Sequence, residues 1–343
     1  MGASSLLSTP PLTTGLASPG VLIVSLDCEG KWGMADHLSR LHHTHMTNAR
    51  LSRAYQLLVD LFRNYEVSAT FAYVMAFVLS PAERREMADL LEPGARADPW
   101  MEHVWASWEA GWTEGWYLPD ALDMVRNEGR HEIASHGFCH RPLDVRSISA
   151  HGAKSELAAA ARAASLKGLA PTTFVYPRNQ VGHLPALREA GFLGYRQGLP
   201  SGNSRLGRLV RLLQELNTSE APQTVVPPRD DAPIPIPGGF FFNWRRGARR
   251  GVPTHTTHLR WRNLLDRAAG EGGVVHLWLH PHNLATAPST AGVLEKVVAY
   301  AARLRDAGRI TILTQEQYCD VVRMRDELHL NESPLTPSLT ACG

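Results

Sequence analysis

The stretch VLIVSLDCEG, Val21 to Gly30, decides the fold class of this chain. Its first six residues are mostly apolar and rich in β-branched side chains, which is typical of a strand buried on both faces. The run then breaks into Asp27 and Glu29, and residues two apart on an extended strand share a face. We therefore expect two carboxylates to lie together at the carboxyl end of a central parallel strand.

Strand-like and helix-like segments alternate along the rest of the chain. The apolar runs SATFAYV, HEIAS, TTFVYP, GYRQG, VVHLWLH and RITILT predict strands, and periodic segments such as LSRAYQLLVDLFRNY lie between them. This βα alternation predicts an α/β fold with a parallel sheet that closes into a distorted (β/α) barrel. We expect a flexible leader at 1–19, one barrel domain at 20–330 with a tryptophan-rich insertion at about 93–119, and a flexible tail at 331–343.

Composition narrows the class of protein. The 343-residue chain is 44% apolar and 20% charged, as expected of a soluble globular protein with room for one large barrel or two ordinary domains. A net charge of +2 does not indicate a nucleic-acid partner, and nothing in the sequence indicates an oligomeric state. No apolar run approaches the roughly 20 residues that span a bilayer. The first residues lack the basic start and apolar core of a secretory signal, so we expect a cytoplasmic protein.

A pair of histidines follows another predicted strand. In HEIASHGFCH, residues 131–140, His136 and His140 are four positions apart. If the backbone turns into a helix there, this spacing stacks both imidazoles on one face, near enough to hold one divalent ion.

Polar side chains also follow two later strands. Arg178 and Asn179 come after TTFVYP, His280 is the last residue of VVHLWLH, and His282 follows two residues later. Parallel barrels carry their chemistry at the carboxyl ends of the strands, so we expect these groups to meet the carboxylates and histidines on one rim. A metal-activated water needs a ligand cage and a nearby base, and this set offers both.

The order and type of these motifs resemble the polysaccharide deacetylase family, also called the NodB-homology or carbohydrate esterase family 4. SLDCEG stands where the family has TFDDG, and SHGFCH matches its HxxxH motif. FVYPRNQ loosely matches RxPxG, and LWLH, Leu277 to His280, matches LxLH. A fourth motif resembling DxxDW is missing, and only FFFNW stands near its place. The resemblance covers roughly residues 20 to 320.

The resemblance implies a role for each matched residue. Glu29, His136 and His140 would hold one divalent metal, with zinc favoured by the ligand set and manganese, cobalt or nickel also fitting. Asp27 would be the base that takes a proton from the activated water, and His280 the acid that protonates the departing amine.

The third motif departs from the family pattern. Val175 occupies the place of the arginine that orients the base, so Arg178 is the expected substitute. Backbone N–H groups near Tyr176 would help to hold the oxyanion. We expect Tyr176, Asn179, Trp32 and His282 to contact the substrate.

Three choices stay open at this point. Either Glu29 or Asp27 is the metal ligand, with the longer Glu29 favoured. Trp32 either stacks on a sugar ring or anchors its loop by hydrophobic packing. Cys28 and Cys139 either form a thiolate zinc site or pack in the core, and strand alternation favours packing because it turns Cys28 away from both carboxylates.

Two further segments have an unusual composition. The insertion holds five of the nine tryptophans, which predict either an aromatic platform for a carbohydrate or a lid on the barrel: Trp100, Trp105, Trp108, Trp112 and Trp116. The basic run from Trp244 to Arg250 either meets a phosphate or carboxylate of the substrate or is solvated surface.

The resemblance implies a metal-dependent hydrolase that removes an N-acetyl group from a sugar. The expected cytoplasmic location favours an intracellular glycan precursor as its substrate. Two alternatives remain: an allantoinase-type or other small-amide hydrolase on the same barrel, and a catalytically silent member that only binds carbohydrate.

Overall fold

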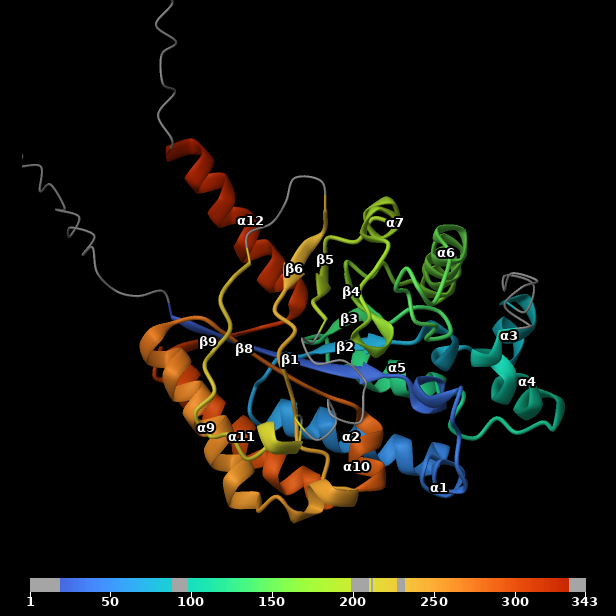
Figure 1. Cartoon of the computed structure of the whole chain (residues 1–343), viewed down its shortest axis with the longest axis horizontal. Helices are drawn as coiled ribbons and strands as arrows, with labels where there is room; N and C mark the ends of the chain where they lie inside the picture. The colour runs from blue at the N-terminus through green and yellow to red at the C-terminus, as the bar shows by residue number, and fades with distance from the viewer. Residues whose placement is uncertain (1–18, 88–97, 199–209, 211, 227–231, 333–343) are drawn as a thin grey trace, which may run out of the picture.

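A nine-stranded sheet forms the centre of the computed structural model, which describes residues 19–87, 98–198, 210, 212–226 and 232–332 (Figure 1). The strands follow the order β6-β5-β4-β3-β2-β1-β8-β7, with β9 beside β1. All paired strands are parallel, as the βα alternation predicts. Their bounds are β1 Gly20–Cys28, β2 Thr70–Tyr73, β3 Glu132–Ser135, β4 Thr173–Val175, β5 Gly194–Arg196, β6 Ile234–Ile236, β7 Phe240–Phe241, β8 Val274–Leu279 and β9 Ile310–Leu313.

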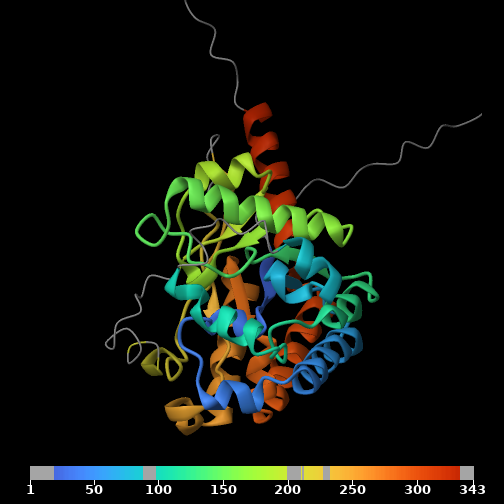
Figure 2. The same cartoon turned by 90° about the vertical axis from the view of Figure 1, so that its right-hand side faces the viewer.

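Helices cover the sheet on both sides. α2, α9, α10 and α11 lie along one side, and α6, α7 and α12 lie along the other (Figures 1 and 2). The α-helices are α1 Arg40–His45, α2 Asn48–Asn64, α3 Pro81–Met87, α4 Glu102–Glu109, α5 Pro119–Arg126, α6 Ala150–Leu166, α7 Leu184–Glu189, α9 Thr254–Glu271, α10 Pro281–Thr286, α11 Ser289–Asp306 and α12 Gln315–Glu332. Short 3₁₀ helices are η1 Gly30–Met34, η2 Met75–Val78, η5 Pro99–Met101, η6 Pro177–Asn179 and η7 Gly247–Gly251.

The predicted ends of the chain fall mostly outside this description. Apart from Pro19, the predicted leader lies outside the described residues, and so does the predicted tail beyond the end of α12 at Glu332. None of the helices in the described ranges is long and apolar enough to cross a membrane.

The sheet curls into an incomplete barrel. β1 pairs with β8 along one edge, and with β9 and then β2 along the other. The strand path ends at β6 and β7, and no hydrogen-bonded pair joins these two strands in the described part of the chain. This architecture confirms the predicted distorted (β/α) barrel.

Alternation along β1 separates an outer from an inner layer. Leu22, Val24 and Leu26 are buried in the main hydrophobic core together with residues of α2, α9 and α11. The alternate residues, which include Ser25 and Asp27, therefore face the interior of the barrel. The hydrophobic run thus forces a carboxylate into the barrel at the end of the strand.

The register brings the carboxyl ends of the strands to one rim. Cys28 pairs with Tyr73, which pairs in turn with Ser135 on β3. On the other side of β1, Leu26 pairs with Leu279, the last residue of β8. Side chains that follow these strands therefore meet, which is how parallel barrels build a site.

Candidate active site

Glu29 lies at the centre of the rim and faces four histidines. Its Oε2 atom is 2.9 Å from His140 Nε2 and 3.5 Å from His136 Nε2. Its Oε1 atom is 3.5 Å from His280 Nε2 and 3.9 Å from His282 Nδ1. Among the described residues, Glu29, His136 and His140 form the group of three whose ligand atoms lie within 4.8 Å of one another. The structure thus brings the three predicted metal ligands together.

The tautomer of His136 makes this group fit a cation. Nδ1 of His136 donates a hydrogen bond of 2.7 Å to the carbonyl of Val175, which leaves a lone pair on Nε2. That lone pair faces the Glu29 carboxylate and His140 Nε2, which is 3.0 Å away. A catalytic zinc site typically has two imidazoles and one carboxylate as its protein ligands. A ligating histidine typically donates its other ring N–H to a carbonyl or carboxylate, as His136 does here.

The protonation states also suit a metal. Burial opposes the charge of Glu29, but its interactions with the facing histidines, of which that with His280 is the largest, outweigh burial, so the pKa of Glu29 lies well below its usual range. Burial lowers the pKa of His140 to about 4, even though Glu29 acts in the opposite direction. At neutral pH the group presents an ionised carboxylate beside a neutral imidazole, as metal binding requires.

The loop between the two histidines is not helical, which corrects the expected i, i+4 stacking. Gly137 and His140 have φ angles of 82° and 61°, so the backbone turns sharply after β3. Buried Glu156 on α6 accepts hydrogen bonds of 2.9 and 2.7 Å from two consecutive backbone N–H groups of this loop. A helix-borne carboxylate therefore fixes the loop that carries both imidazoles.

Asp27 points into the barrel and is held by Arg196 at the end of β5. The guanidinium binds both carboxylate oxygens, at 2.7 and 2.6 Å, and both side chains are buried. Burial raises the pKa of Asp27, but the charge and hydrogen bonds of Arg196 outweigh it, so the pKa is lowered. Asn179 accepts a further 2.9 Å bond from Arg196, so this predicted substrate contact supports the guanidinium.

The same arginine continues into a buried hydrogen-bond chain. Arg196 donates to Ser25 Oγ at 3.2 Å, and Ser25 Oγ lies 2.8 Å from His276 Nε2. Nδ1 of His276 lies 2.7 Å from the carbonyl of Pro237, so Nδ1 donates there and Nε2 accepts from the serine. Burial, with the charge of Arg196, lowers the pKa of His276 to about 3, which agrees with a neutral ring. Sequence reasoning missed all three of these supporting side chains.

Arg178 pairs with Asp36 and not with Asp27, the residue that it was expected to orient. Its Nη2 atom binds Asp36 at 2.5 Å, and its guanidinium lies 4.5 Å above the ring of Trp100. Arg178 adopts a φ of 57° in η6 and is turned toward the η1 end of the rim. Arg196 makes the contact with Asp27 that was expected of Arg178. Its place at the end of the predicted strand GYRQG could have indicated this contact.

His280 faces both carboxylates. Its Nε2 atom is 4.0 Å from Asp27 Oδ2 and 3.5 Å from Glu29 Oε1. Its Nδ1 atom is 3.3 Å from Asn283 Oδ1, which also accepts from the His280 backbone N–H at 3.1 Å. The start of α10 therefore fixes the ring, and a histidine in this position can pass a proton at the rim.

Two predicted substrate contacts have buried side chains. Trp32 is 3% exposed, and its Nε1 donates to the carbonyl of Trp116 at 2.7 Å, which favours the hydrophobic anchor over stacking on a sugar. Tyr176 is 1% exposed, and its hydroxyl donates to the carbonyl of Gly182 at 2.8 Å. Only the backbone of Tyr176 remains a candidate for contact with a reacting group.

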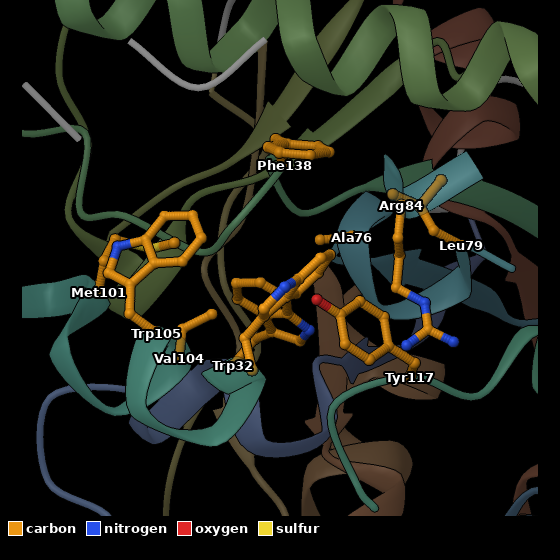
Figure 3. Close-up of a pocket in the computed structure, with 10 residues that line it drawn as sticks. Trp32, Ala76, Leu79, Arg84, Met101, Val104, Trp105, Tyr117 and Phe138 are labelled. Carbon is orange, nitrogen blue, oxygen red and sulfur yellow. The ribbon is translucent and has the colours of Figure 1, made fainter. Parts of the chain in front are cut away.

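The insertion packs on the barrel and forms an aromatic pocket. Trp32, Trp105, Tyr117 and Phe138 line this pocket, with Arg84 on one side of it (Figure 3). Trp32 and Phe138 come from the two loops that carry the candidate metal ligands, so the pocket adjoins these loops. Residues 93–97 of the predicted insertion lie outside the described residues.

The cysteines beside the ligands belong to the core. Cys28 and Cys139 are both fully buried and lie in the main hydrophobic cluster. Burial raises the pKa of both thiols well above the usual range, so neither is a thiolate at neutral pH. These positions support packing and disfavour a thiolate zinc site.

Comparison with known proteins supports the fold. No protein-family model and no curated protein matches the sequence. Among solved structures, a protein assigned as a polysaccharide deacetylase from Mycobacterium smegmatis is 16% identical with a TM-score of 0.59, over 94% of this chain and 96% of that one. Another from Pseudomonas aeruginosa PAO1 is 15% identical with a TM-score of 0.52, over 90% and 91% of the two chains. The chain therefore has the polysaccharide deacetylase fold.

Proposed function

We propose that this chain is a metal-dependent hydrolase that removes an N-acetyl group from a sugar or glycan precursor. One observation carries the proposal: an arginine-held carboxylate, Asp27, and a histidine-flanked carboxylate, Glu29, share one rim with His280. The deacetylase fold supports the same chemistry. Hydrolysis of an amide needs a base, an acid and a group that polarises the carbonyl, and the rim offers candidates for all three.

Glu29, His136 and His140 would hold the metal. Both oxygens of Asp27 are engaged by Arg196, whereas the ion pairs described for Glu29 are all with histidines, so Glu29 is the better ligand. A divalent ion bound there supplies a Lewis acid for the amide carbonyl and lowers the pKa of water. Zinc fits this ligand set best, and manganese, cobalt and nickel are compatible with it.

The chain's own side chains would move the protons. Asp27 is ionised and would accept a proton from the attacking water. Because Arg196 lowers the pKa of Asp27, Asp27 is a weak base and can accept a proton only from a water whose own pKa is lowered. His280 would protonate the departing nitrogen from its Nε2 atom. The backbone N–H of Tyr176 stays our candidate for holding the developing oxyanion.

The test is hydrolysis by the metal-loaded full chain. Acetate release from a panel of N-acetylated sugars, with metal content measured on the same sample, would support the proposal. Ring opening of allantoin without acetate release from any sugar would assign the small-amide alternative. Carbohydrate binding without turnover at full metal occupancy would assign the silent alternative.

We further propose a cytoplasmic glycan precursor as the substrate. Cell fractionation of the native protein tests the location independently of the chemistry. Recovery outside the cytoplasmic membrane would overturn this part of the proposal and leave the reaction class intact.

A further inference from the structure

A second cavity adjoins the histidine side of the rim. It has a volume of about 400 Å³, including its open mouth, and residues of η1, α1 and α10 line it: Gly33, Met34, His37, His42, Met46, Trp244, His282 and Thr286. His282 connects it to the candidate metal centre, because His282 Nδ1 lies 3.9 Å from Glu29 Oε1. A group seated in this cavity would therefore lie beside a substrate amide at the rim.

A buried nitrogen without a partner lies at the junction. His282 is 7% exposed, and its Nδ1 atom has no hydrogen-bond partner among the described residues. Unsatisfied buried polar atoms are rare in native proteins and often mark a position that a ligand completes.

The opposite wall supplies a second donor. The backbone N–H of Ser39 donates to His42 Nδ1 at 3.1 Å, so the proton of the neutral ring is on Nε2. Burial and the nearby charges of His37 and Arg246 lower the pKa of His42 to about 4, which keeps the ring neutral at pH 7. The Nε2–H group of His42 is thus a neutral donor in the wall of the cavity.

Arg246 adds a positive charge that lacks a counterion in the described structure. Its guanidinium lies 5.4 Å from the ring of Trp244, which lines the cavity, and its Nη1 atom is buried without a hydrogen-bond partner among the described residues. None of the described residues that line the cavity is a carboxylate, and the neighbouring Asp36 is already paired with His37 and Arg178. His42 and Arg246 thus add a neutral donor and a positive charge at a wall of the cavity that carries no described carboxylate, which favours an anion.

We infer that this cavity binds an anionic oxygen group of the substrate, a carboxylate or a phosphate, next to the scissile amide. The inference rests on the proposed function and narrows its substrate class to acidic N-acylated sugars. It also gives a role to the basic run from Trp244 to Arg250, which the sequence left open between substrate contact and solvated surface.

Kinetics on matched sugars test the inference. N-acetylglucosamine, its 6-phosphate and the corresponding uronic acid differ only at C6, so kcat/KM for the three compares a neutral group, a phosphate and a carboxylate. We expect at least one acidic sugar to exceed the neutral sugar by about tenfold to a hundredfold, as for a charge-assisted hydrogen bond. The faster acidic sugar identifies the anion. Equal kcat/KM for all three would overturn the inference and leave the proposed function standing.

Variants locate the effect. Arg246→Gln should reduce the ratio of kcat/KM for acidic over neutral sugar by about tenfold. His42→Phe, which removes the imidazole donor, should reduce it too. Arg250→Gln is the matched control, since it removes one charge from an exposed position of the same basic run and should leave the ratio unchanged. An equal loss in Arg246→Gln and Arg250→Gln would mean general electrostatic attraction and would overturn the site.

A binding measurement separates this inference from the reaction. Titration of the metal-loaded full chain with inorganic phosphate should change tryptophan fluorescence, because Trp244 lines the cavity, and Arg246→Gln should raise the apparent Kd by about tenfold. If no sugar is hydrolysed but this difference is seen, the proposed function fails and the anion site stands. Equal Kd values for wild type and Arg246→Gln would overturn the anion site.

Discussion

The two carboxylates of the rim are two residues apart, yet their surroundings are opposite in kind. Asp27 faces a guanidinium that binds both of its oxygens, and the bonding continues through Ser25 to His276. Glu29 faces imidazole nitrogens, one of which is an acceptor aimed at it. Arg196 already binds both oxygens of Asp27, whereas a cation bound beside Glu29 would be attracted by the carboxylate and by the lone pair of His136.

This difference explains how two acids so close in the sequence could take the different roles that we propose. A buried carboxylate paired with a guanidinium is held ionised and in a fixed orientation, as a general base must be. A carboxylate whose oxygens are not bound by a guanidinium has ligand atoms free to bind a metal. The partners across the barrel, and not the strand that carries both acids, therefore support the different roles that we propose.

Removing the base tests the assignment most strongly. Asp27→Asn keeps the shape of the side chain and an oxygen that can accept from Arg196, but it cannot take a proton. We expect kcat to fall by about 10²- to 10⁴-fold. Metal content should stay at the wild-type level, since Glu29, His136 and His140 are untouched. Loss of metal together with activity would reverse the roles of the two carboxylates.

Breaking the buried ion pair should have the largest effect on folding. Arg196→Met leaves Asp27 buried without its cation, which should lower the free energy of unfolding by about 3–5 kcal/mol. Urea denaturation measures this change. Arg178→Met is the matched control, because its partner Asp36 is partly exposed and such pairs contribute about 1 kcal/mol or less. Equal losses in the two variants would show that Arg196 has no special role.

The arginine also marks the limit of what the sequence could predict. The hydrophobic run of β1 predicted where Asp27 and Glu29 lie, because alternation and the parallel barrel fix a strand's faces and its end. The same rule placed His136, His140 and His280 on the rim. This prediction uses only the local sequence pattern and the direction of the strands, so it can be made before any tertiary contact is known.

The partners of these residues could not be predicted in the same way. Whether Arg178 or Arg196 meets Asp27 depends on how the sheet curls, and β5 and β1 are separated by three strands in the sheet order. The burial of Trp32 depends on the packing of the insertion, whose tryptophans suggested an exposed platform equally well. The loop after β3 depends on Glu156 of α6, which lies 16 residues beyond His140 in the sequence.

Metal addition should affect only the Glu29 side. A divalent ion at 100 times its Kd should raise the free energy of unfolding by about 2.7 kcal/mol, provided that the unfolded chain does not bind it. Denaturation with zinc and with a chelator measures the increase. His136→Ala should abolish it, and Asp27→Asn should retain it. An increase of equal size in His136→Ala would place the ion elsewhere.

A third buried carboxylate, Glu156, can be compared with Asp27 through the direction of its pKa shift. Glu156 accepts from backbone N–H groups and from the Cys139 thiol, but the structure describes no direct ion pair for it. Burial raises its pKa, and hydrogen bonds from Cys139 and the charge of Arg141 reduce the shift without reversing it. Asp27 and Glu156 thus show opposite shifts in pKa, because only Asp27 is bound directly to a guanidinium.

The opposite shifts predict opposite trends with pH. Because the pKa of Glu156 is raised in the folded protein, the folded protein binds this proton more tightly than the unfolded chain does. Protonated Glu156 therefore stabilises the fold fully when the pH is below the pKa of an unperturbed glutamate. This stabilisation is lost as the pH rises through the raised pKa of the folded state. Glu156→Gln keeps an oxygen acceptor for the loop but does not titrate. The free energy of unfolding of the wild type, relative to this variant, should therefore fall as pH rises from 4.5, by about 1.4 kcal/mol for each unit of the shift. Urea denaturation of both proteins between pH 4.5 and 8 measures the trend. If this relative stability rises with pH instead, hydrogen bonds alone are enough to stabilise the ionised form of a buried carboxylate in this protein. The lowered pKa of Asp27 would then not require Arg196.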